Sequence, residues 1–542
     1  MLLLSWEIIQ KSPHLAFPAM NGTHLTPKPF AFIQARLGST RLPGKVLLEL
    51  PEGSGVTILD HIFNRLIQIL PKERIVFLIP EIDLGLKDFL NRRGYLWFAG
   101  SETDVRERYI LAAETFGAKD IIRLTGDNPF IDIHSVELLM ESICHLQTEK
   151  YCLSFLNLPL GMGAECFSYE ALVNEKDTKT EPRHREHVSL HIKEDLEKYS
   201  VYRLVPPYLN SKDMEESDQI RMTIDEPSDL KLANLVWKEL GDKFPFFGSK
   251  EVIELYRKKP NLFLENESVK QVRFSLPKSE FGKKKIHIQY GDPKQFGSGH
   301  FDRCQSLSIE LQMNGYSVSM DTKYQPGADA FLLDARETVP EDETVFLIDN
   351  LEYKNRKNPY LFLLPHPSVE WEDKNHFSFY TSPLIDSYRN EEKVTGDWFI
   401  YAGALNEVYS DSLDRYLTEV LSPKWGIGNI TRVGGTKPKL SNIRYYSRLA
   451  KADYMKRISK SEGFISYFGQ STLEAIYMKK KVAIFGMTEI HKELGMFLSK
   501  KIEIPYLGEP KNWIHPPDIC LSPRLGLDRN AQNVILNWLK TL

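Results

Sequence analysis

The sequence predicts an α/β protein, because short apolar strands alternate with amphipathic helices along most of the chain. The alternation starts near residue 30, begins again near residue 286, and begins once more near residue 393. Strands that alternate with helices favour parallel sheets covered by helices on both faces. A length of 542 residues allows two to four domains. We therefore expect an N-terminal domain followed by a second domain of two lobes.

The composition is that of an ordinary globular protein, with 42% hydrophobic and 26% charged residues. The net charge of −4 gives no overall basic field, so we expect no nucleic-acid partner. The five cysteines form no CxxC pair, which argues against a zinc site or a disulfide framework and fits a reducing, cytoplasmic compartment. No apolar run approaches the roughly 18 residues of a membrane span.

The start of the chain is predicted to be an extension that covers residues 1–27. It begins with MLLLSWEIIQK, which is short, contains Glu7 and lacks the basic start of a signal peptide. Met20 is a second candidate start.

The first domain is predicted to span residues 28–264, and its elements follow from the spacing of apolar residues. The spacing predicts strands at 30–33, 74–80, 95–98 and 119–124, and helices at 57–70, 83–93 and 104–116. Ligands of such sheets bind at the carboxyl ends of the strands. Two polar motifs fall at these ends, so we expect the site there.

The loop after the first strand, within FAFIQARLGSTRLPGK, combines small and cationic residues. Gly38 and Gly44 let the backbone approach a ligand closely. Backbone N–H groups and the side chains of Arg36, Arg41 and Lys45 favour phosphate oxygens. The Walker pattern, GxxxxGK followed by Ser or Thr, is absent. The residues predict a phosphate-binding loop, with a Gly/Pro-rich surface turn as the alternative.

Two aspartates follow short strand-like runs about a hundred residues apart. Asp127 lies in TGDNP and Asp225 lies in TIDEP. Mg²⁺ takes one or two carboxylates together with phosphate oxygens and water, so this pair is a suitable set of ligands. The alternative is that each aspartate is a turn former or a helix cap.

From about Phe30 to about Leu232 these motifs resemble, in the same order, the SpsF-like branch of the sugar cytidylyltransferases, which is similar to the CMP-sialate and CMP-KDO synthetases. The resemblance implies a Rossmann-like, GT-A-like nucleotidyltransferase domain that uses CTP and Mg²⁺, with Asp127 and Asp225 as metal ligands. It implies that a sugar oxygen attacks the α-phosphorus of CTP and that pyrophosphate leaves, with Arg41 and Lys45 as catalytic residues. The expected nucleotide-binding residues are Gln34, Arg36, Gly38, Ser39, Thr40, Arg41 and Lys45.

Three further motifs match this family on the side of the sugar acceptor. GSETDVRERY, GMGAE and RHREH imply substrate-binding roles for Asp104, Arg108, Glu165, Arg185 and His187. A solvated helix face explains the first two nearly as well, and a structural polar cluster explains the last two about as well. Arg123, before TGD, is either another phosphate binder or a solvated strand-end arginine. The acidic residue that the family has before the glycine-rich turn is missing in GMGAE, which leaves the acceptor, a sugar or sugar acid, open.

The polar segment 265–285 is predicted to be the linker, followed by lobes at 286–392 and 393–542. HIQYGD, YSVSM, FLLD, TVFLID and DWFIYAGA are predicted strands. Two successive lobes of this type suggest the GT-B architecture, with a cleft between them. The stretch GSGH, ending at His300, lies between a strand and a helix, where a helix N-terminus favours anions and a histidine can act as a general base.

GSGHFDRC and YFGQSTLEA, in this order, resemble the PseG-type UDP-sugar hydrolases, relatives of the MurG glycosyltransferases. The resemblance implies that His300 activates water at the anomeric carbon of a UDP-amino-sugar and that Arg303 contacts the substrate. It implies nucleotide binding by Gly469, Ser471, Thr472 and Glu474. The chain departs from the family at Ala402, at Gln470, and near residue 490, where TEIHKE replaces an Asn-Gln pair.

Two hypotheses follow. The first is a bifunctional enzyme of nonulosonate or surface-polysaccharide sugar synthesis, of the legionaminic or pseudaminic type, which combines cytidylyl transfer with UDP-sugar hydrolysis. The second is a single-activity nucleotidyltransferase whose GT-B-like domain is a glycosyltransferase or a binding module. A homodimer is an option that the sequence leaves open.

Overall fold

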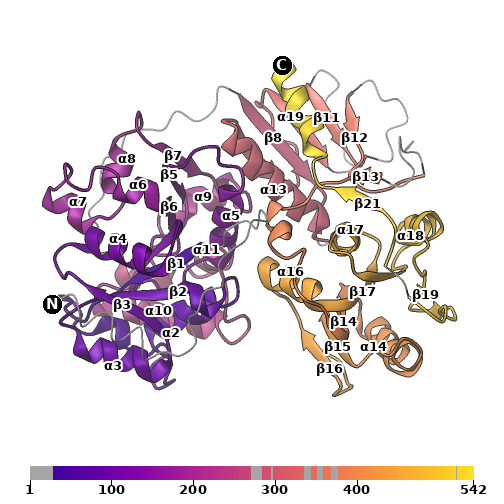
Figure 1. The fold of residues 1–542 in the computed structure, drawn as a ribbon, viewed down its shortest axis with the longest axis horizontal. Helices are drawn as coiled ribbons and strands as arrows, with labels where there is room; N and C mark the ends of the chain where they lie inside the picture. The colour runs from indigo at the N-terminus through magenta and orange to yellow at the C-terminus, as the bar shows by residue number, and fades with distance from the viewer. Residues whose placement is uncertain are drawn as a thin grey trace.

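The computed structural model describes residues 29–269, 284–293, 297–334, 343–350, 358–367, 376–520 and 522–542. The predicted extension 1–27 and most of the predicted linker lie outside these residues. Figure 1 shows the N-terminal domain in indigo and purple on one side and two further sheets, red to yellow, on the other. In the described ranges, no helix is both long and apolar enough to pass through a membrane.

The N-terminal domain is built on a seven-stranded sheet of order β3-β2-β1-β4-β6-β5-β7. Its strands are β1 Phe30–Gln34, β2 Ile75–Pro80, β3 Leu96–Gly100, β4 Asp120–Thr125, β5 Tyr151–Phe155, β6 Glu165–Ser168 and β7 Ser200–Leu204. The strands β1 to β4 pair in parallel, as predicted, but β6 runs antiparallel to both β4 and β5. The sheet is therefore mixed rather than wholly parallel. The chain crosses from β4 through α5 to β5, which runs in the same direction as β4, and β6 then returns antiparallel between these two strands.

Helices cover both faces of this sheet (Figure 1). They are α2 Ile58–Leu66, α3 Leu84–Arg93, α4 Val105–Phe116, α5 Ile133–Ile143, α6 Tyr169–Val173, α7 Pro182–Glu186, α8 Leu190–Glu194, α9 Ser211–Ser217, α10 Pro227–Leu240 and α11 Ser249–Lys258. The helix α2 starts at a capping box in which Thr57 and Asp60 bond each other's backbone N–H groups. Its apolar face, with Leu59, Ile62 and Leu66 fully buried, packs in the core that contains β1 and β2.

The domain ends later than the sequence predicts. The 3₁₀ helix η3, Pro260–Asn266, packs on α10, and Asn266 is buried. The Asn266 side chain donates hydrogen bonds to Asp229 Oδ1 at 2.8 Å and to the Arg221 carbonyl at 3.2 Å. Residues 265 and 266 therefore belong to the N-terminal domain and not to a linker.

Two five-stranded parallel sheets follow, of order β12-β11-β10-β8-β9 and β16-β15-β14-β17-β18. The first contains β8 Lys285–Tyr290, β9 Ser317–Asp321, β10 Ala330–Asp334, β11 Val345–Ile348 and β12 Tyr360–Leu361. The second contains β14 Val394–Gly403, β15 Asn429–Gly434, β16 Ile443–Tyr446, β17 Ser461–Tyr467 and β18 Lys481–Phe485. Short two-stranded ladders join β13 His376–Ser378 to β21 Gly526–Asp528 and β19 Gly508–Glu509 to β20 Asn512–Trp513. The C-terminal region thus contains two further parallel sheets, and its division into lobes of the GT-B type stays a prediction.

The helices of this region are α13 Gly299–Met313, α14 Glu407–Arg415, α15 Ser422–Trp425, α16 Lys451–Lys460, α17 Gln470–Tyr477, α18 Glu489–Ile502 and α19 Gln532–Thr541. The last helix departs from the predicted boundary 393–542. Ile535 and Leu539 of α19 pack in the core of the first lobe, with Ile286 and Phe346. The chain therefore returns to the first lobe at its end, as Figure 1 shows.

The N-terminal domain and the first lobe share a packed interface. Leu138 of α5, Leu204 of β7 and Ile309 of α13 form one buried apolar cluster. Glu141 of α5 accepts a hydrogen bond from Ser382 Oγ at 2.6 Å. The described parts therefore meet through buried apolar and polar contacts.

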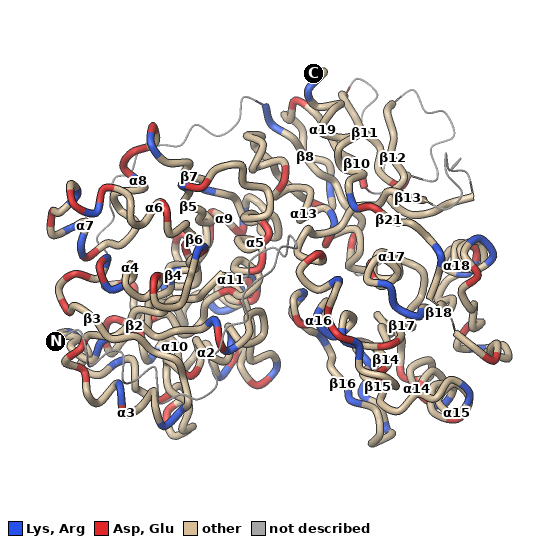
Figure 2. The backbone as a smooth tube through the Cα atoms, in the orientation of Figure 1, with Lys and Arg blue, Asp and Glu red and all other residues tan. Residues whose placement is uncertain are grey.

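All five cysteines are free, as their spacing predicts. Figure 2 shows acidic and basic residues interspersed along the backbone, in keeping with the small net charge.

Candidate active site

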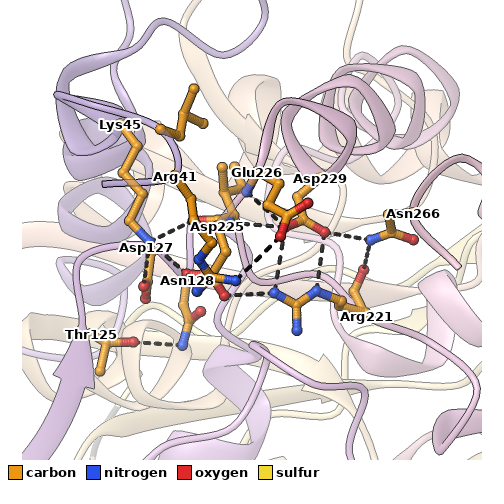
Figure 3. A network of polar contacts seen from close by, with 12 residues as sticks. Arg41, Lys45, Thr125, Asp127, Asn128, Arg221, Asp225, Glu226, Asp229 and Asn266 are labelled. Atoms are coloured by element: carbon orange, nitrogen blue, oxygen red, sulfur yellow. Dashed lines mark hydrogen bonds and ion pairs between the residues drawn. The ribbon is translucent and has the colours of Figure 1, made fainter. Parts of the chain in front are cut away.

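The centre of the N-terminal site is an ammonium group held between two carboxylates (Figure 3). Lys45 Nζ donates hydrogen bonds to Asp127 Oδ2, Asp225 Oδ1 and the Ile224 carbonyl, each at 2.8 Å. Lys45 follows the loop after β1, Asp127 follows β4, and Asp225 precedes α10. The structure thus brings together three residues that the sequence placed up to 180 positions apart.

Two arginines also bind the Asp225 carboxylate. Arg221 Nη2 donates to Asp225 Oδ2 at 2.6 Å, and Arg41 Nη2 lies 3.2 Å from Asp225 Oδ1. Burial disfavours the charged carboxylate, but the hydrogen bonds and charges of Lys45, Arg221 and Arg41 outweigh it and hold the pKa of Asp225 below its ordinary value. Asp225 is therefore ionised near neutral pH.

The turn that carries Asp225 is fixed by a residue that sequence reasoning missed. Asp229 Oδ2 accepts hydrogen bonds from the backbone N–H groups of Asp225 at 2.9 Å and Glu226 at 3.0 Å. Its other oxygen accepts from Arg221 Nε at 3.1 Å. Arg221 and Asp229 both lie in RMTIDEPSDL, at the same four-residue spacing on either side of Asp225, and that spacing was the available signal.

The loop between β1 and Lys45 presents its polar groups to solvent. Arg36, Gly38, Thr40 and Arg41 are exposed, and Ser39 is partly exposed. Gly44 closes the loop through an N–H bond to the Leu37 carbonyl at 3.1 Å, and its φ of 67° favours glycine. The loop therefore offers small residues and two cations beside the Lys45 site.

Gln34 and Glu165 belong to a second polar cluster at the same end of the sheet. Arg123 donates to Gln34 Oε1 at 3.3 Å and to Glu165 Oε2 at 3.2 Å. Glu165 also accepts from Ser189 Oγ at 2.7 Å and from Lys193. Burial disfavours its charge, but Lys193 and Arg123 hold the pKa of Glu165 well below its ordinary value. Arg123 is thus a paired, largely buried arginine, which excludes the solvated alternative.

The acceptor-side residues separate into buried and exposed ones. Arg108 is 3% exposed and donates to the carbonyls of Ser101 and Leu78, so it holds a loop and does not lie on a solvated helix face. Asp104 caps α4 through Glu107 N–H at 2.9 Å, and its carboxylate lies 3.7 Å from Arg185 Nε. Arg185 is half-exposed and His187 is partly buried.

Asp127 and Asp225 fit the predicted metal role as a pair. Within the ranges described above, no group of three or more His, Cys, Asp or Glu side chains is arranged to hold a metal ion. Mg²⁺ needs only one or two carboxylates when a nucleotide supplies phosphate oxygens. The two carboxylates converge on one cation, Lys45, so their positions suit a second cation that arrives with a ligand.

A second candidate site lies at the start of α13. His300 Nδ1 is 2.7 Å from Asp334 Oδ1, and Asp334 also accepts from Arg303 Nε at 2.6 Å. Burial disfavours its charge, but Arg303 and His300 hold the pKa of Asp334 well below the ordinary range. An ionised Asp334 accepts a hydrogen bond from the Nδ1–H group of His300, which leaves Nε2 as the nitrogen without a proton in the neutral imidazole.

Arg303, predicted to contact the substrate, lines the cavity but is held by two buried carboxylates. Its side chain is 2% exposed, and Nη1 lies 2.6 Å from Asp349 Oδ2 while the other nitrogens bind Asp334. The nitrogens of the guanidinium that bind Asp334 and Asp349 are already paired, which leaves little donor capacity for a substrate. Arg303 is therefore a residue that positions Asp334.

A cavity of about 1210 Å³ joins His300 to the start of α17. Gly469, Ser471 and Glu474, which the sequence predicts to bind a nucleotide, line this cavity. Thr472 does not line it. The Thr472 side chain is fully buried and donates to the Tyr467 carbonyl at 3.1 Å, so it joins strand to helix. Burial raises the pKa of Glu474 above its ordinary value despite the charge of nearby Lys451.

The comparisons with known proteins concern the N-terminal domain. A family model described as Cytidylyltransferase matches residues 30–269. The Spore coat polysaccharide biosynthesis protein SpsF of Bacillus subtilis is 32% identical over 243 residues, which are 44% of this chain and 97% of that protein. The Uncharacterized protein MJ1063 of Methanocaldococcus jannaschii is 32% identical over 250 residues, 45% of this chain and 96% of that protein.

Among solved structures, a cytidylyltransferase from Leptospira borgpetersenii is 29% identical, with a TM-score of 0.40, and covers 45% of this chain and 99% of that one. The family match ends at residue 269, before the two later sheets begin. Because the family model matches residues 30–269 and the 32% identity to SpsF extends over 97% of that protein, the chain belongs through this region to the cytidylyltransferase family.

Proposed function

We propose that the N-terminal domain transfers a cytidylyl group from CTP to a sugar or sugar acid. The observation that carries this proposal is Lys45, held by Asp127 and Asp225 beside a glycine-containing loop with Arg36 and Arg41. A sugar oxygen forms a bond to the α-phosphorus, the bond to the bridging oxygen breaks, and pyrophosphate leaves with the electron pair. The proton of the attacking hydroxyl passes to solvent.

The chain's own contribution is to hold charge in place. Lys45 and Arg41 are paired with carboxylates, and phosphate oxygens can exchange for those partners without exposing an unpaired charge. Mg²⁺ bound by Asp127 and Asp225 would neutralise triphosphate charge. Arg221 and Asp229 keep Asp225 in position while its partners change.

The acceptor is proposed from the relatives and from the exposed residues. The name of the Bacillus subtilis relative places that protein in spore coat polysaccharide biosynthesis, so we propose surface-polysaccharide sugars as the acceptor class. Arg185, which lies near Asp104, and the partly buried His187 are the candidate acceptor contacts.

The test is a panel of nucleotides and sugars read by pyrophosphate release from the full chain. We expect release with CTP, Mg²⁺ and one class of sugar or sugar acid, and little with other nucleoside triphosphates. Absence of CTP-dependent release across hexose, amino-sugar and nonulosonate acceptors would overturn the proposal.

A second candidate function is hydrolysis of a UDP-amino-sugar in the C-terminal region, as in nonulosonate synthesis of the legionaminic or pseudaminic type. The His300–Asp334 pair beside a cavity that reaches α17 favours it. Water would attack the anomeric carbon, the bond to the UDP oxygen would break, UDP would leave with the electron pair, and His300 Nε2 would take the proton. The two lobes then form a GT-B-like domain with the nucleotide at α17.

UDP release from a panel of UDP-amino-sugars tests this second function. Release by the parent chain supports hydrolysis. UDP binding without release supports the alternative, a glycosyltransferase or a binding module. The cytoplasmic location and a homodimer stay predictions.

A further inference from the structure

The cavity beside His300 has walls from three parts of the chain. Both C-terminal lobes line it, with His300 from α13 and Ser471 from α17. The N-terminal domain lines it as well, with His134 and Tyr208. A cavity formed only by the two lobes would be open on the side that the cytidylyltransferase domain covers. The second site is therefore not contained in the second domain.

One side chain in this wall has an unused donor. Gln305 of α13 lines the cavity although its side chain belongs to a residue only 3% exposed. Its Oε1 lies 2.7 Å from His134 Nε2 of the N-terminal domain. Among the residues that the structure describes, none accepts a hydrogen bond from Gln305 Nε2. Gln305 Nε2 is not among the fully buried polar atoms that lack a partner, so it is accessible from the cavity, where a ligand oxygen can accept its hydrogen bond.

His134 is itself held in place by the N-terminal domain. Its ring packs against Tyr208 with 4.7 Å between centroids, and its Nδ1 lies 3.8 Å from Glu137 Oε2. Tyr208 in turn donates to Asp132 Oδ2 at 2.8 Å. Because Oε1 of Gln305 is fixed on His134, the amide nitrogen of Gln305 is fixed as well, at the opposite corner of the same planar group.

The contact belongs to a built interface that extends along α13. At the far end of the helix Gln312 clamps the backbone of Val205, accepting from its N–H at 2.7 Å and donating to its carbonyl at 3.0 Å. Gln312 is buried and does not line the cavity. Two glutamines of α13 thus contact the N-terminal domain, and only Gln305 lines the cavity.

We propose that His134 is a positioning residue which the cytidylyltransferase domain supplies to the second site, and that Gln305 Nε2 is a donor to the sugar part of a nucleotide-linked sugar bound there. The inference rests on the proposed nucleotide-sugar function of this cavity. Gln305 lies on α13, whose first turn carries His300, the residue that we place at the anomeric carbon, whereas Ser471 lies at the nucleotide end. A hydroxyl or N-acetyl carbonyl of the sugar is the acceptor that fits an amide donor.

The test compares the affinities of the full chain for UDP and for UDP-N-acetylglucosamine, by calorimetry. We expect Gln305→Ala and His134→Ala to weaken binding of UDP-N-acetylglucosamine about 5- to 10-fold, the value of one hydrogen bond, and to leave UDP affinity within about twofold. His134→Gln keeps an N–H donor near Gln305 and should restore most of the loss. Gln312→Ala removes an interdomain contact of the same kind away from the cavity and should change neither affinity.

Each result that differs from this expectation overturns a specific part of the proposal. If the parent binds both ligands and the His134 and Gln305 variants do so equally well, the positioning role is wrong while the nucleotide-sugar site stands. If His134→Ala weakens UDP and UDP-N-acetylglucosamine alike, or Gln312→Ala does the same, the effect comes from the interface and the inference fails. If the parent binds neither ligand, the proposed function of the cavity fails, and this inference fails with it.

Discussion

The two candidate sites use ion pairs in opposite ways. At the N-terminal site the side chains of Lys45, Asp127 and Asp225 are 11%, 25% and 20% exposed. At the C-terminal site Asp334 is fully buried and Arg303 is 2% exposed. An ion pair that solvent reaches can exchange partners with an arriving phosphate, whereas breaking a fully buried pair leaves an uncompensated charge. Accessibility therefore separates carboxylates that can meet a ligand from one that holds a histidine.

The same difference in exposure divides the neighbours of each carboxylate into partners that stay in place and partners that a ligand can displace. Around Asp225, Arg221 and Asp229 form the fixed part and Lys45 and Arg41 form the part that a ligand can redirect. Around Asp334 every partner is fixed except His300, whose side chain is 30% exposed and lines the cavity. A variant at each site should thus affect activity and stability in different proportions.

The largest effect is expected at the N-terminal site. Asp127→Asn and Asp225→Asn should each reduce CTP-dependent pyrophosphate release by about 10³-fold or more, because each removes a charge from the group that organises the triphosphate. Their free energies of unfolding should stay within about 1 kcal/mol of the parent, since the pairs they break are partly solvated. A stopped-time assay of pyrophosphate release measures the catalytic rate. Urea unfolding measures the free energy of unfolding.

Glu226→Gln is the matched control. Glu226 follows Asp225 and lies at 3.5 Å from Arg41, but it does not contact Lys45. Near-parental turnover is expected in this control. Near-parental turnover in Asp127→Asn or Asp225→Asn at saturating Mg²⁺ would remove that aspartate from the site.

The second-largest effect is expected in the free energy of unfolding, when the buried pair of Asp334 and Arg303 is broken. Asp334→Asn should lower the free energy of unfolding by about 3–5 kcal/mol, because it leaves the Arg303 guanidinium buried without its main counter-charge. Urea unfolding followed by tryptophan fluorescence measures the change. A loss below about 1 kcal/mol, the size expected for Asp225→Asn, would show that burial does not distinguish the two sites.

His300→Asn is predicted to change chemistry without the stability cost. General-base catalysis contributes about 10²–10⁴-fold, so UDP release should fall by about 10²-fold or more while UDP affinity and the CTP reaction stay as in the parent. Initial rates of UDP release across UDP-amino-sugars check the first part, and calorimetry checks the second. Hydrolysis at the parental rate in the variant would exclude His300 as the base.

The sequence predicts the strand and helix succession well where local pattern decides it. The alternation from Phe30 to Thr125 and from β8 to β11 is confirmed, because parallel strands with both faces buried are continuous apolar runs. The stretch from Tyr151 to Leu204 was not resolved from sequence. There β6 reverses direction, and direction depends on which strand it pairs with rather than on its own residues.

The sequence predicts which residues are candidates for the site, but it does not predict which of them contact one another. Strand-end position predicts that Asp127 can meet a ligand, but not that Lys45 lies between it and Asp225. Arg108 and Arg303 are of a residue type that often contacts ligands. Only the tertiary structure shows that Arg108 binds backbone carbonyls and that Arg303 binds buried carboxylates. His134 was missed because its partner, Gln305, lies 171 residues away on another domain.

The smallest effect is expected at the outermost cation of the N-terminal site. Arg41 is half-exposed, and its contacts with Asp225 and Glu226 are 3.2 and 3.5 Å long. Such a pair contributes about 0–1 kcal/mol to stability, so Arg41→Ala should leave unfolding unchanged. A guanidinium beside a triphosphate is worth more, about 1.5–3 kcal/mol for a charged hydrogen bond, so CTP affinity should fall at least about 10-fold. Arg92→Ala, an exposed arginine on α3, is the control for a lost surface charge and should leave CTP affinity as it is. Calorimetric titration of both variants with CTP and Mg²⁺ decides the matter, because equal affinities would show that the exposed end of the loop is structural and that the exchangeable part of the site is Lys45 alone.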